Sequence, residues 1–516
     1  MSRRKRTDVG AIVGIDLGTT NSALAILDDA GRPTIVENAA GSNITPSAIY
    51  FEMDNGGAVS VGQDAKDQES LFPERVFQAF KRSMDHDDPI TDKAMNESVA
   101  ATPVELSAHV LRKLIADASA RVGAIDSAVI TVPANFADEA RRNTIAAGEL
   151  AGLTVKHIIN EPTAAIFYYA YEKPLSGTVV VYDLGGGTLD VTIAHVDGTS
   201  VEIITSKGDP RLGGIDFDLR LREIIAARYA ETTGETFDMP KVHDLGKSIE
   251  DYKKQFSGRD SITIQVTGGA VGKTVFEVTR DEYEAATSTL IARADLLVEG
   301  TLLDAGLAPA DISNVLLVGG STRMPMISAH LESLFGRTPI CSVNPDEVVA
   351  LGAALYAGFN AEPATMTPAQ TNSTRSMQLR EVANHFYGTL VLDTSHPSGL
   401  RDRVSIVIEK NMPIPVAKTE TFYTVSEGQT AVDCTVTQSV TRELDPDFVR
   451  RIWSGELGPL PPGRPSQQEI VVTFSYDANQ VMHCSFLDVA TGMKQEISLG
   501  LGASASNQSD EGFKVS

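Results

Sequence analysis

Residues 12–26 read IVGIDLGTTNSALAI, and residues 179–193 read VVVYDLGGGTLDVTI. Each stretch is an apolar run that ends in Asp-Leu-Gly, followed by small residues and a second apolar run. This pattern predicts a β-hairpin with a tight turn. One hairpin repeated in two halves of a domain predicts two similar lobes that face each other.

The turns of both hairpins have the composition of a phosphate-binding loop. A phosphate chain needs backbone N–H groups at close range, and only residues with small side chains let the backbone come near. Gly18–Thr20 and Gly185–Thr188 consist of glycine and threonine, and the threonine hydroxyls add donors. One such hairpin is equally consistent with an ordinary tight turn, but two matching copies favour a bound nucleotide.

An aspartate precedes each turn, Asp16 in the first hairpin and Asp183 in the second. Two carboxylates beside a triphosphate would repel it unless a cation lies between them. Mg²⁺ suits this place because it is bound through few carboxylates and keeps several waters. The sequence therefore predicts Mg²⁺ held through water by Asp16 and Asp183, where it neutralises charge that develops during phosphoryl transfer.

The rest of the chain divides into two parts of different secondary structure. Strand-like and helix-like segments alternate from about residue 11 to 359, for example strand 128–132 and helix 138–150, which predicts an α/β domain. Residues 361–376 show no periodicity and are interpreted as a linker. Short alternating stretches then predict an antiparallel β-sandwich. Its expected strands are 404–408, 419–424, 431–436, 469–476, 481–487 and 494–499.

Composition excludes several classes of function. The chain has 516 residues, of which 42% are hydrophobic, and a formal net charge of -24. Such an acidic protein is not expected to bind nucleic acid or an anionic membrane, because phosphates are held by clustered Lys and Arg. Three scattered cysteines fit a reducing cytoplasm without disulfides. No stretch approaches the roughly 18 apolar residues of a membrane helix.

Five motifs together resemble the seventy-kilodalton heat-shock chaperone family, of the DnaK type. They are Asp16–Asn21, Asn160–Ala165, Asp183–Thr188, Gly319–Arg323 and Asn344–Asp346. The resemblance covers residues 12–358 strongly and residues 381–499 more weakly. It implies an actin-like (ribonuclease H-like) two-lobed ATPase domain followed by an all-β sandwich. The expected division is a disordered tail over 1–10, a nucleotide-binding domain over 11–360, a linker over 361–380, a peptide-binding domain over 381–500 and a disordered tail over 501–516.

The resemblance also implies roles at the reacting phosphates. Asp16 and Asp183 would orient Mg²⁺ and its waters, and Glu161 would orient the attacking water. Lys81 would stabilise the γ-phosphate, although the match is offset by one residue before it. The expected contacts of phosphate or nucleophile are Thr19, Thr20 and Thr188, with Gly18, Gly185, Gly186 and Gly187 beside them.

The base and ribose of ATP or ADP would lie against a helix. Glu250, Lys253, Lys254 and Ser257 follow the i, i+3, i+4, i+7 spacing that places side chains on one helix face. Such a face is otherwise a charged solvent face, and the resemblance instead packs it on the nucleotide. The other side of the pocket is expected to be closed by Gly319, Gly320, Ser321, Arg323 and Asp346. Gly213 and Gly214 belong to a loop resembling a phosphate sensor, in which Ile215 replaces an acidic residue.

The β-rich part resembles the family's clamp for extended peptides. Val404, Ile406, Val432 and Val436 are candidates to line its apolar pocket, or are ordinary sandwich core. Gln378 and Arg380 stand where the family's linker is apolar, so coupling of the domains is expected to be altered. The family usually has a helical lid after the sandwich, and this chain is expected to lack one. His157 and Ile145 replace basic residues on the face that docks a J-domain partner, so that partner is not expected.

Three functions fit these patterns. The first is an ATP-dependent chaperone that binds unfolded or extended peptides, acts in stress response and works with a nucleotide-exchange factor. The second is a nucleotide-responsive scaffold for one dedicated partner with little turnover, favoured by the altered linker. The third is a metabolite kinase on the same fold, which Asn160–Thr163 and the sandwich disfavour.

Overall fold

The structure is a computed structural model. It describes residues 11–52, 58–86, 90–91, 100–173, 175–236, 245–246, 248–267, 272–341, 343–393, 400–477 and 480–499. The two tails expected to be disordered, 1–10 and 501–516, lie outside the described residues. Packing divides the chain into two compact units. The first comprises 1–136, 143–202 and 206–379, and the second comprises 380–516 with the short pieces 137–142 and 203–205.

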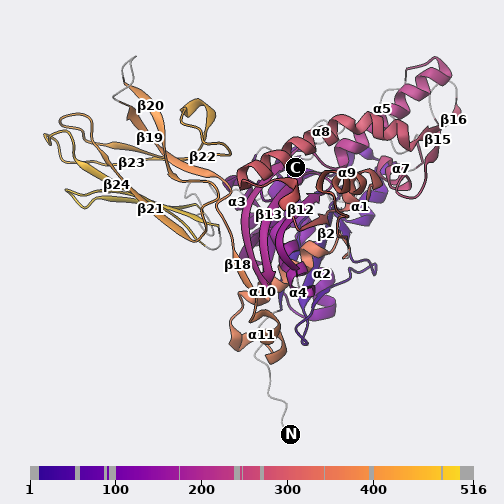
Figure 1. Cartoon of the computed structure of the whole chain (residues 1–516), viewed down its shortest axis with the longest axis horizontal. Coiled ribbons are helices and arrows are strands. Elements are labelled where there is room, and N and C mark those ends of the chain that lie inside the picture. Colours follow the sequence, from indigo (N-terminus) through magenta and orange to yellow (C-terminus); the bar gives the residue numbers. More distant parts are fainter. Residues whose placement is uncertain are drawn as a thin grey trace, which may run out of the picture. The chain divides into compact units, whose positions relative to one another are not determined.

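The first unit is built on two mixed sheets (Figure 1). One sheet has the order β11-β10-β1-β2-β3 with β4 beside β2, and the other has the order β17-β12-β13-β14-β18. The strands of the first are Ile12–Asp16 (β1), Asn21–Leu27 (β2), Pro33–Ile35 (β3), Thr45–Pro46 (β4), Ser127–Val132 (β10) and Thr154–Asn160 (β11). Those of the second are Leu175–Leu184 (β12), Leu189–Gly198 (β13), Ser200–Asp209 (β14), Asn314–Val318 (β17) and Gln378–Arg380 (β18).

Each sheet contains one of the two similar hairpins. Strands β1 and β2 pair antiparallel, and β1 also pairs in parallel with β10. Strands β12 and β13 pair antiparallel, and β12 also pairs in parallel with β17. The chain therefore repeats one local arrangement in two sheets, as the internal near-repeat predicts. The actin-like fold class and the sandwich expected from the sequence are both confirmed.

Helices and small sheets complete this unit. The helices are Gln63–Asp67 (α1), Pro103–Val122 (α2), Asp138–Leu150 (α3), Glu161–Glu172 (α4), Gly214–Thr233 (α5), Ile249–Gln255 (α7), Arg280–Ala305 (α8), Pro325–Phe335 (α9), Val348–Phe359 (α10) and Pro368–Thr374 (α11). Two 3₁₀ turns also matter for the site, Phe80–Ser83 (η4) and Gly320–Arg323 (η7). The remaining strands are Ile49–Glu52 (β5), Ala58–Val61 (β6), Val76–Phe77 (β7), Ile90–Thr91 (β8), Ala100–Ala101 (β9), Ser261–Thr267 (β15) and Lys273–Thr279 (β16).

We call the part of this unit built on the sheet of β1 the first lobe and the part built on the sheet of β12 the second lobe. Small residues let helix α10 pack closely in the core of the first lobe. A Cβ atom added at Gly14 on β1 would overlap the backbone of Ala354 on α10. A Cβ atom added at Gly352 on α10 would overlap the carbonyl oxygen of Ala164 on α4. Since only glycine allows these approaches, the strand that ends in Asp16 and the helix that begins at Glu161 are held at a fixed separation.

The second unit is a sandwich of two four-stranded antiparallel sheets, drawn in orange and yellow in Figure 1. Their orders are β20-β19-β22-β23 and β21-β24-β25-β26. The strands are Phe386–Asp393 (β19), Arg401–Ile408 (β20), Val416–Tyr423 (β21), Val432–Ser439 (β22), Arg450–Leu457 (β23), Glu469–Tyr476 (β24), Met482–Asp488 (β25) and Lys494–Leu499 (β26). Alternate residues of β24 and β25 face a core that contains Tyr387, Phe474 and Phe486.

Three local predictions differ from the structure. Residues 368–374 of the supposed linker form helix α11, which begins with a capping box at Thr367. This helix is too short to show periodicity, and it is held on β2 by Gln370 Nε2, which donates to Leu27 O at 2.8 Å. The prediction also missed strands β19 and β23, in which glycine and charged residues interrupt the alternation. Third, Ile145 is buried on α3, so it presents nothing to a partner, and its use as evidence about a J-domain was wrong.

The altered linker still joins a sheet. Gln378 N–H donates to Thr199 O at 3.0 Å, and Thr199 Oγ1 donates to Ser376 O at 2.7 Å, so β18 extends the sheet of β14. On the linker side these contacts use only the backbone groups of Ser376 and Gln378, which polar residues supply as well as apolar residues do. An altered side-chain composition is therefore compatible with pairing at this sheet edge.

Candidate active site

The first glycine turn, between β1 and β2, is fixed by a pair of buried serines. Gly18 N–H donates to Ser22 Oγ at 3.2 Å, and Ser47 Oγ donates to Gly18 O at 2.7 Å. The two hydroxyls also lie 2.9 Å apart. A Cβ atom added at Gly18 would overlap Asn21 O. Glycine is therefore required at this turn, and the serines hold its backbone in one orientation.

The second turn, between β12 and β13, is held by the start of helix α5. Gly214 N–H donates to Gly185 O at 3.0 Å, and Ile215 N–H donates to Gly186 O at 2.9 Å. Ser321 Oγ, on η7, also donates to Gly185 O, at 2.9 Å. Since the carbonyl of one residue and the N–H of the next point in opposite directions across a trans peptide, these bonds turn the following N–H groups away from α5.

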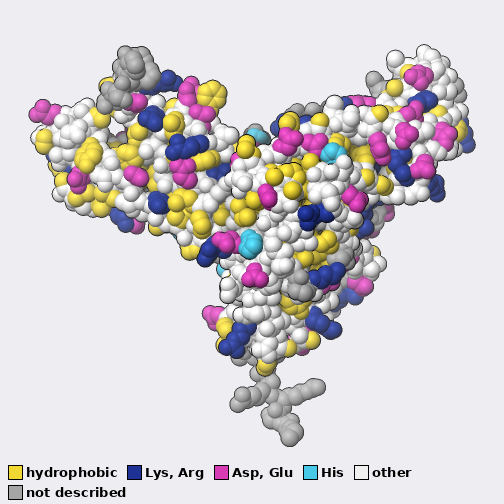
Figure 2. Space-filling model, viewed as in Figure 1, with side chains coloured by type: hydrophobic (Ala, Val, Ile, Leu, Met, Phe, Trp, Pro, Cys, Tyr) yellow, Lys and Arg dark blue, Asp and Glu magenta, His cyan; other side chains and the backbone are white. Residues whose placement is uncertain are grey.

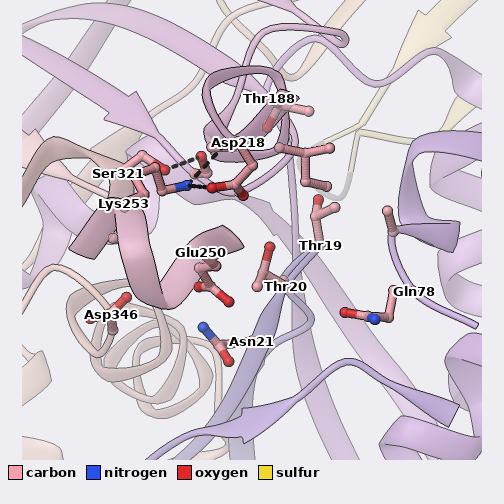
Figure 3. A pocket seen from close by; sticks show the side chains of 18 of the residues that line it. Thr19, Thr20, Asn21, Gln78, Thr188, Asp218, Glu250, Lys253, Ser321 and Asp346 are labelled. Atoms are coloured by element: carbon pink, nitrogen blue, oxygen red, sulfur yellow. Dashed lines mark hydrogen bonds and ion pairs between the residues drawn. The ribbon is translucent and has the colours of Figure 1, made fainter. Parts of the chain in front are cut away.

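The two turns face each other. A Cβ atom added at Gly186 would overlap Thr20 Oγ1, and one added at Gly187 would lie 2.6 Å from Thr19 Cγ2. Figure 3 shows Thr19 and Thr20 of the first turn and Thr188 of the second around the same space. Two glycine-rich turns from different sheets thus lie in contact, as expected for a site that grips a phosphate chain from two sides.

The turns line a cavity of about 1180 Å³ in the first unit. It brings together these residues named from the sequence: Asp16, Gly18, Thr19, Thr20, Lys81, Glu161, Asp183, Gly185, Gly186, Thr188, Gly214, Glu250, Lys253, Lys254, Ser257, Gly319, Gly320, Ser321, Arg323 and Asp346. Gly187 and Gly213 lie behind this lining, where a Cβ atom added at Gly213 would lie 2.5 Å from the Gly187 backbone. Ile215, which replaces the expected acidic residue, also faces the cavity.

Three carboxylates and one lysine form the buried end of the cavity. Lys81 Nζ pairs with Glu161 Oε1, and the two side chains are 4% and 12% exposed. Thr131 Oγ1 donates to Asp16 Oδ1 at 2.8 Å. Burial, together with Glu161, raises the pKa of Asp16 to about 7, although Lys81 and Thr131 oppose the shift. Burial and the neighbouring carboxylates raise the pKa of Asp183 well above its usual range.

The opposite end carries the residues that the sequence analysis expected beside the base and ribose. Glu250 pairs with Lys66 at 2.7 Å and with Lys254 at 2.9 Å. Burial works against its ionisation, but the two lysines outweigh it and lower the pKa of Glu250 to about 2. Lys253 Nζ lies 2.8 Å from Asp218 Oδ1, as Figure 3 shows, and it donates to Gly214 O at 2.9 Å. The charged face of α7 thus lines the cavity.

Two segments that contact each other close this end, Gly319–Arg323 and Asn344–Asp346. Arg323 donates through Nη2 to Asp346 Oδ2 at 2.9 Å, and it also bonds Asn344 Oδ1. A Cβ atom added at Gly320 would lie 2.5 Å from Asp346 Oδ1. Ser321 is buried, whereas the Arg323 side chain is half exposed. The motifs Gly319–Arg323 and Asn344–Asp346 are therefore one wall, built by direct contacts between them.

The comparison with known proteins agrees with this geometry. A family model described as Hsp70 protein matches residues 12–513. The chain belongs to the Hsp70 family. Members of the Hsp70 family are ATP-dependent chaperones whose ATPase domain uses ATP or ADP with Mg²⁺. The match covers both the two-lobed unit and the β-sandwich, as expected from the five motifs and the second-domain resemblance.

The acidic end of this Hsp70 cavity fits a hydrated Mg²⁺. Asp183 Oδ2 is buried and has no hydrogen-bond partner among the described residues, and Asp16 faces the same space. Among the described residues there is no group of three or more His, Cys, Asp or Glu placed to bind a metal directly. Mg²⁺ retains several waters and needs few direct protein ligands. The chemistry that it would supply is neutralisation of charge on the phosphates.

Several residues of the Hsp70 cavity were missed by the sequence reasoning. They are Asn21, Lys66, Glu69, Gln78, Arg82, Asp216, Asp218 and Arg222. Asp218 could have been predicted from the sequence. It lies near the start of the helix that follows Gly213–Gly214, and the start of this helix must face the second glycine-rich turn. Lys66 could not have been predicted, since it lies on α1, and only the folded chain brings that helix to Glu250.

On the face shown in Figure 2, Lys and Arg side chains are interspersed with Asp and Glu. No helix within the described ranges has the length and apolar composition needed to cross a membrane. Of the four valine and isoleucine candidates in the sandwich, Val404 and Val436 are fully buried, and Ile406 and Val432 are partly buried.

Proposed function

We propose that the cleft of the first unit binds Mg·ATP and hydrolyses it. The observation that carries the proposal is the contact between the two glycine turns, at Gly186 and Thr20, beside the buried carboxylates. In this proposal Asp16 and Asp183 hold the hydrated cation, Glu161 orients the attacking water, and Lys81 stabilises the terminal phosphate. Such catalysis works by positioning and by fixed charge.

The nucleotide would lie across the cavity from the acidic end to α7. The phosphates would bind the turns at Gly18–Thr20 and Gly185–Thr188, supported by the Gly213–Gly214 corner. The ribose and base would contact Glu250, Lys253, Lys254 and Ser257 on one side. Gly319, Gly320, Ser321, Arg323 and Asp346 would close the other side. All but Gly187 and Gly213 line one cavity, which supports this assignment.

The sandwich is proposed to bind extended peptides, and hydrolysis to control their release. Residues 440–449 run along β20, where Leu444 O accepts from Val404 N–H at 2.9 Å and Asp445 pairs with Arg401 at 2.8 Å. Beside this edge, Leu400, Val440 and Phe448 are 69%, 60% and 74% exposed. Exposed apolar side chains near a strand edge suit recognition of an extended chain through its backbone and side chains.

The expected division into a nucleotide domain over 11–360 and a peptide domain over 381–500 remains part of this proposal. A nucleotide-exchange factor is the expected partner of the first, and an ordinary J-domain partner is not expected. We infer a cytoplasmic location from the cysteines. All three are free thiols, and burial raises the pKa of Cys434 to about 12, which suits a protein kept reduced.

The decisive experiment measures single-turnover ATP hydrolysis by the whole chain, with and without an unfolded peptide, and peptide affinity in the same sample. A chaperone hydrolyses ATP faster when peptide is present, and it binds peptide more weakly with ATP than with ADP. Glu161→Ala is the control, because it should bind ATP and hydrolyse it slowly. Hydrolysis that peptide leaves unchanged would instead support the scaffold, which Gln378 and Arg380 in the linker favour. ADP formation only with a small polyol would support the kinase.

A further inference from the structure

Arg82 has no role in the scheme above, yet it joins the two lobes at the second phosphate turn. It lies on η4, directly after Lys81 and after Ala79, whose φ of 57° turns the chain sharply into the cavity. Its Nε donates to Gly187 O at 2.8 Å. Its Nη2 lies 2.5 Å from Asp216 Oδ2, and the two side chains are only 18% and 23% exposed.

Asp216 is itself part of the support of that turn. Its Oδ2 accepts from Gly213 N–H at 2.8 Å, which fixes the start of α5. The carbonyls of Gly185 and Gly186 are bonded to the first turn of the same helix, at Gly214 and Ile215. Arg82 supplies the third bond, to Gly187 O. Three successive carbonyls of the turn are thus anchored, the first two from the second lobe and the third from the first lobe.

Anchoring the carbonyl of Gly187 fixes the orientation of the following N–H. The peptide between Gly187 and Thr188 is planar and trans, so Thr188 N–H points opposite to Gly187 O. It therefore points away from Arg82, and Thr188 lines the cavity. The same η4 turn also carries Lys81, whose Nζ pairs with Glu161 Oε1. One short turn thus positions both a cation and a backbone donor at the phosphate end.

We propose that Arg82 is a positioning residue for the terminal phosphate. It orients Thr188 N–H, and it holds the η4 turn with Lys81 against the second glycine turn. A guanidinium suits this task because its planar fork reaches a carbonyl and a carboxylate at once, which an ammonium cannot do in the same geometry. The inference rests on the proposed binding of Mg·ATP.

The test compares Arg82→Met, Arg82→Lys and Asp216→Asn with the wild-type chain. Single-turnover ATP hydrolysis should fall at least tenfold in Arg82→Met and less in Arg82→Lys. Affinity for a non-hydrolysable Mg·ATP analogue should fall at least threefold, while affinity for Mg·ADP should change less than threefold, since ADP lacks the terminal phosphate. Arg220→Met is the matched control, because Arg220 pairs with Glu223 on the same helix α5 and does not line the cavity, so its substitution should leave all three values unchanged.

A second measurement separates positioning from general packing. Arg82→Ala should regain hydrolysis when methylguanidinium is added, because the small cation can occupy the vacated place, and Arg220→Ala should not respond. If Arg82→Met hydrolyses ATP within twofold of wild type, or lowers ADP and ATP-analogue affinities equally, the inference is overturned. If Arg82→Met does not fold, Asp216→Asn decides by the same criteria. A wild-type chain that binds no nucleotide overturns this inference and the proposed function together, whereas an active wild type with unaffected variants overturns this inference alone.

Discussion

Lys66 Nζ on α1 lies 2.7 Å from Glu250 Oε2 on α7, across the cavity that the two helices line. The side chains are 20% and 18% exposed, so the pair is partly shielded from water. It connects the first lobe to the helix on which we place the nucleotide base. Opening of the cleft must break this contact, and the rate of nucleotide release should therefore depend on it.

We expect Lys66→Met to release ADP faster than wild type. A partly buried ion pair is worth about 1 kcal/mol, which corresponds to about a fivefold change in rate. The measurement is stopped-flow displacement of a fluorescent ADP. Because the pKa of Glu250 lies at about 2, the pair stays ionised from pH 6 to pH 8, and the difference between variant and wild type should not vary over that range.

Lys113→Met is the control for this first prediction. Lys113 pairs with Asp117 within helix α2 and does not line the cavity. Its substitution should leave ADP release unchanged. Equal release rates in Lys66→Met and wild type would show that the contact does not limit opening.

Mg²⁺-dependent binding of ADP should be tighter at pH 8 than at pH 6. The pKa of Asp16 is raised to about 7, so the proton on this buried carboxyl stabilises the folded state below about pH 4, and that contribution is lost as pH rises through 7. A Mg²⁺ ion held through water by Asp16 would favour the ionised carboxylate, which predominates at pH 8, whereas most of this carboxyl is protonated at pH 6. We expect Mg²⁺-dependent ADP affinity to fall about tenfold from pH 8 to pH 6.

Calorimetry at the two pH values, with and without Mg²⁺, measures this effect. Asp16→Asn should remove most of the pH dependence, which separates Asp16 from protonation of the nucleotide itself. Asp183→Asn should weaken Mg²⁺-dependent ATP binding, because its buried Oδ2 would no longer face the cation as a carboxylate. Equal heats with and without Mg²⁺ in the wild type would contradict the metal assignment.

Glu161→Gln should bind Mg·ATP nearly as wild type and hydrolyse it at least a hundredfold more slowly. The amide keeps the size of the side chain but cannot accept a proton from water, and groups in that role contribute about 10²- to 10⁴-fold. Single-turnover hydrolysis under saturating ATP gives the rate, and calorimetry gives the affinity. Glu172→Gln, at the last residue of the same helix α4, is the control. An unchanged hydrolysis rate in Glu161→Gln would show that Glu161 does not take part in the reaction.

Gly186→Ala should abolish nucleotide binding without unfolding the protein. The added methyl group would overlap Thr20 Oγ1, so the two glycine turns would have to separate. Gly258→Ala is the matched control, because a Cβ atom there has no neighbour within 4 Å. Isothermal calorimetry with Mg·ADP and a thermal unfolding curve test both variants. Wild-type affinity in Gly186→Ala would mean that the turns do not meet around a ligand.

The sequence predicted these turns because their chemistry is local. A run of glycine and threonine after Asp16, and again after Asp183, specifies both backbone freedom and charge. The two-lobed fold followed from their repetition and from the family resemblance. The close packing of helix α10 could not be predicted in this way. It depends on the small residues Gly352 and Ala353, which act only by letting the helix approach its neighbours.

Contacts between segments that lie far apart in the sequence could not be predicted. Lys66 and Glu250, or Arg82 and Asp216, show no pairing signal in a single sequence, since surface charges look the same whether they are solvated or paired. Helix α11 was missed for a different reason. Its polar composition resembles a linker, and its stability comes from bonds to the first sheet, such as the one from Gln370 to Leu27.

Arg464→Met should destabilise the β-sandwich by about 3 kcal/mol, whereas Arg442→Met should change its stability by less than about 0.5 kcal/mol. Arg464 donates to both oxygens of Asp488, at 3.1 and 2.7 Å, and the Asp488 side chain is fully buried. Removal of the arginine leaves a buried carboxylate without its cation. The pair between Arg442 and Glu409 is also close, at 2.9 Å, but 60% and 42% exposed.

The only tryptophan of the chain reports on this unit. Trp453 stacks on Phe486 at a centroid distance of 5.9 Å, within the sandwich. Urea unfolding followed by tryptophan fluorescence therefore measures the free energy of unfolding of the sandwich in the whole chain. Arg464→Met should move the fluorescence midpoint to lower urea, and Arg442→Met should coincide with wild type. If all three unfolding curves coincide, the pairing of Arg464 with the buried Asp488 does not contribute to the stability of the sandwich.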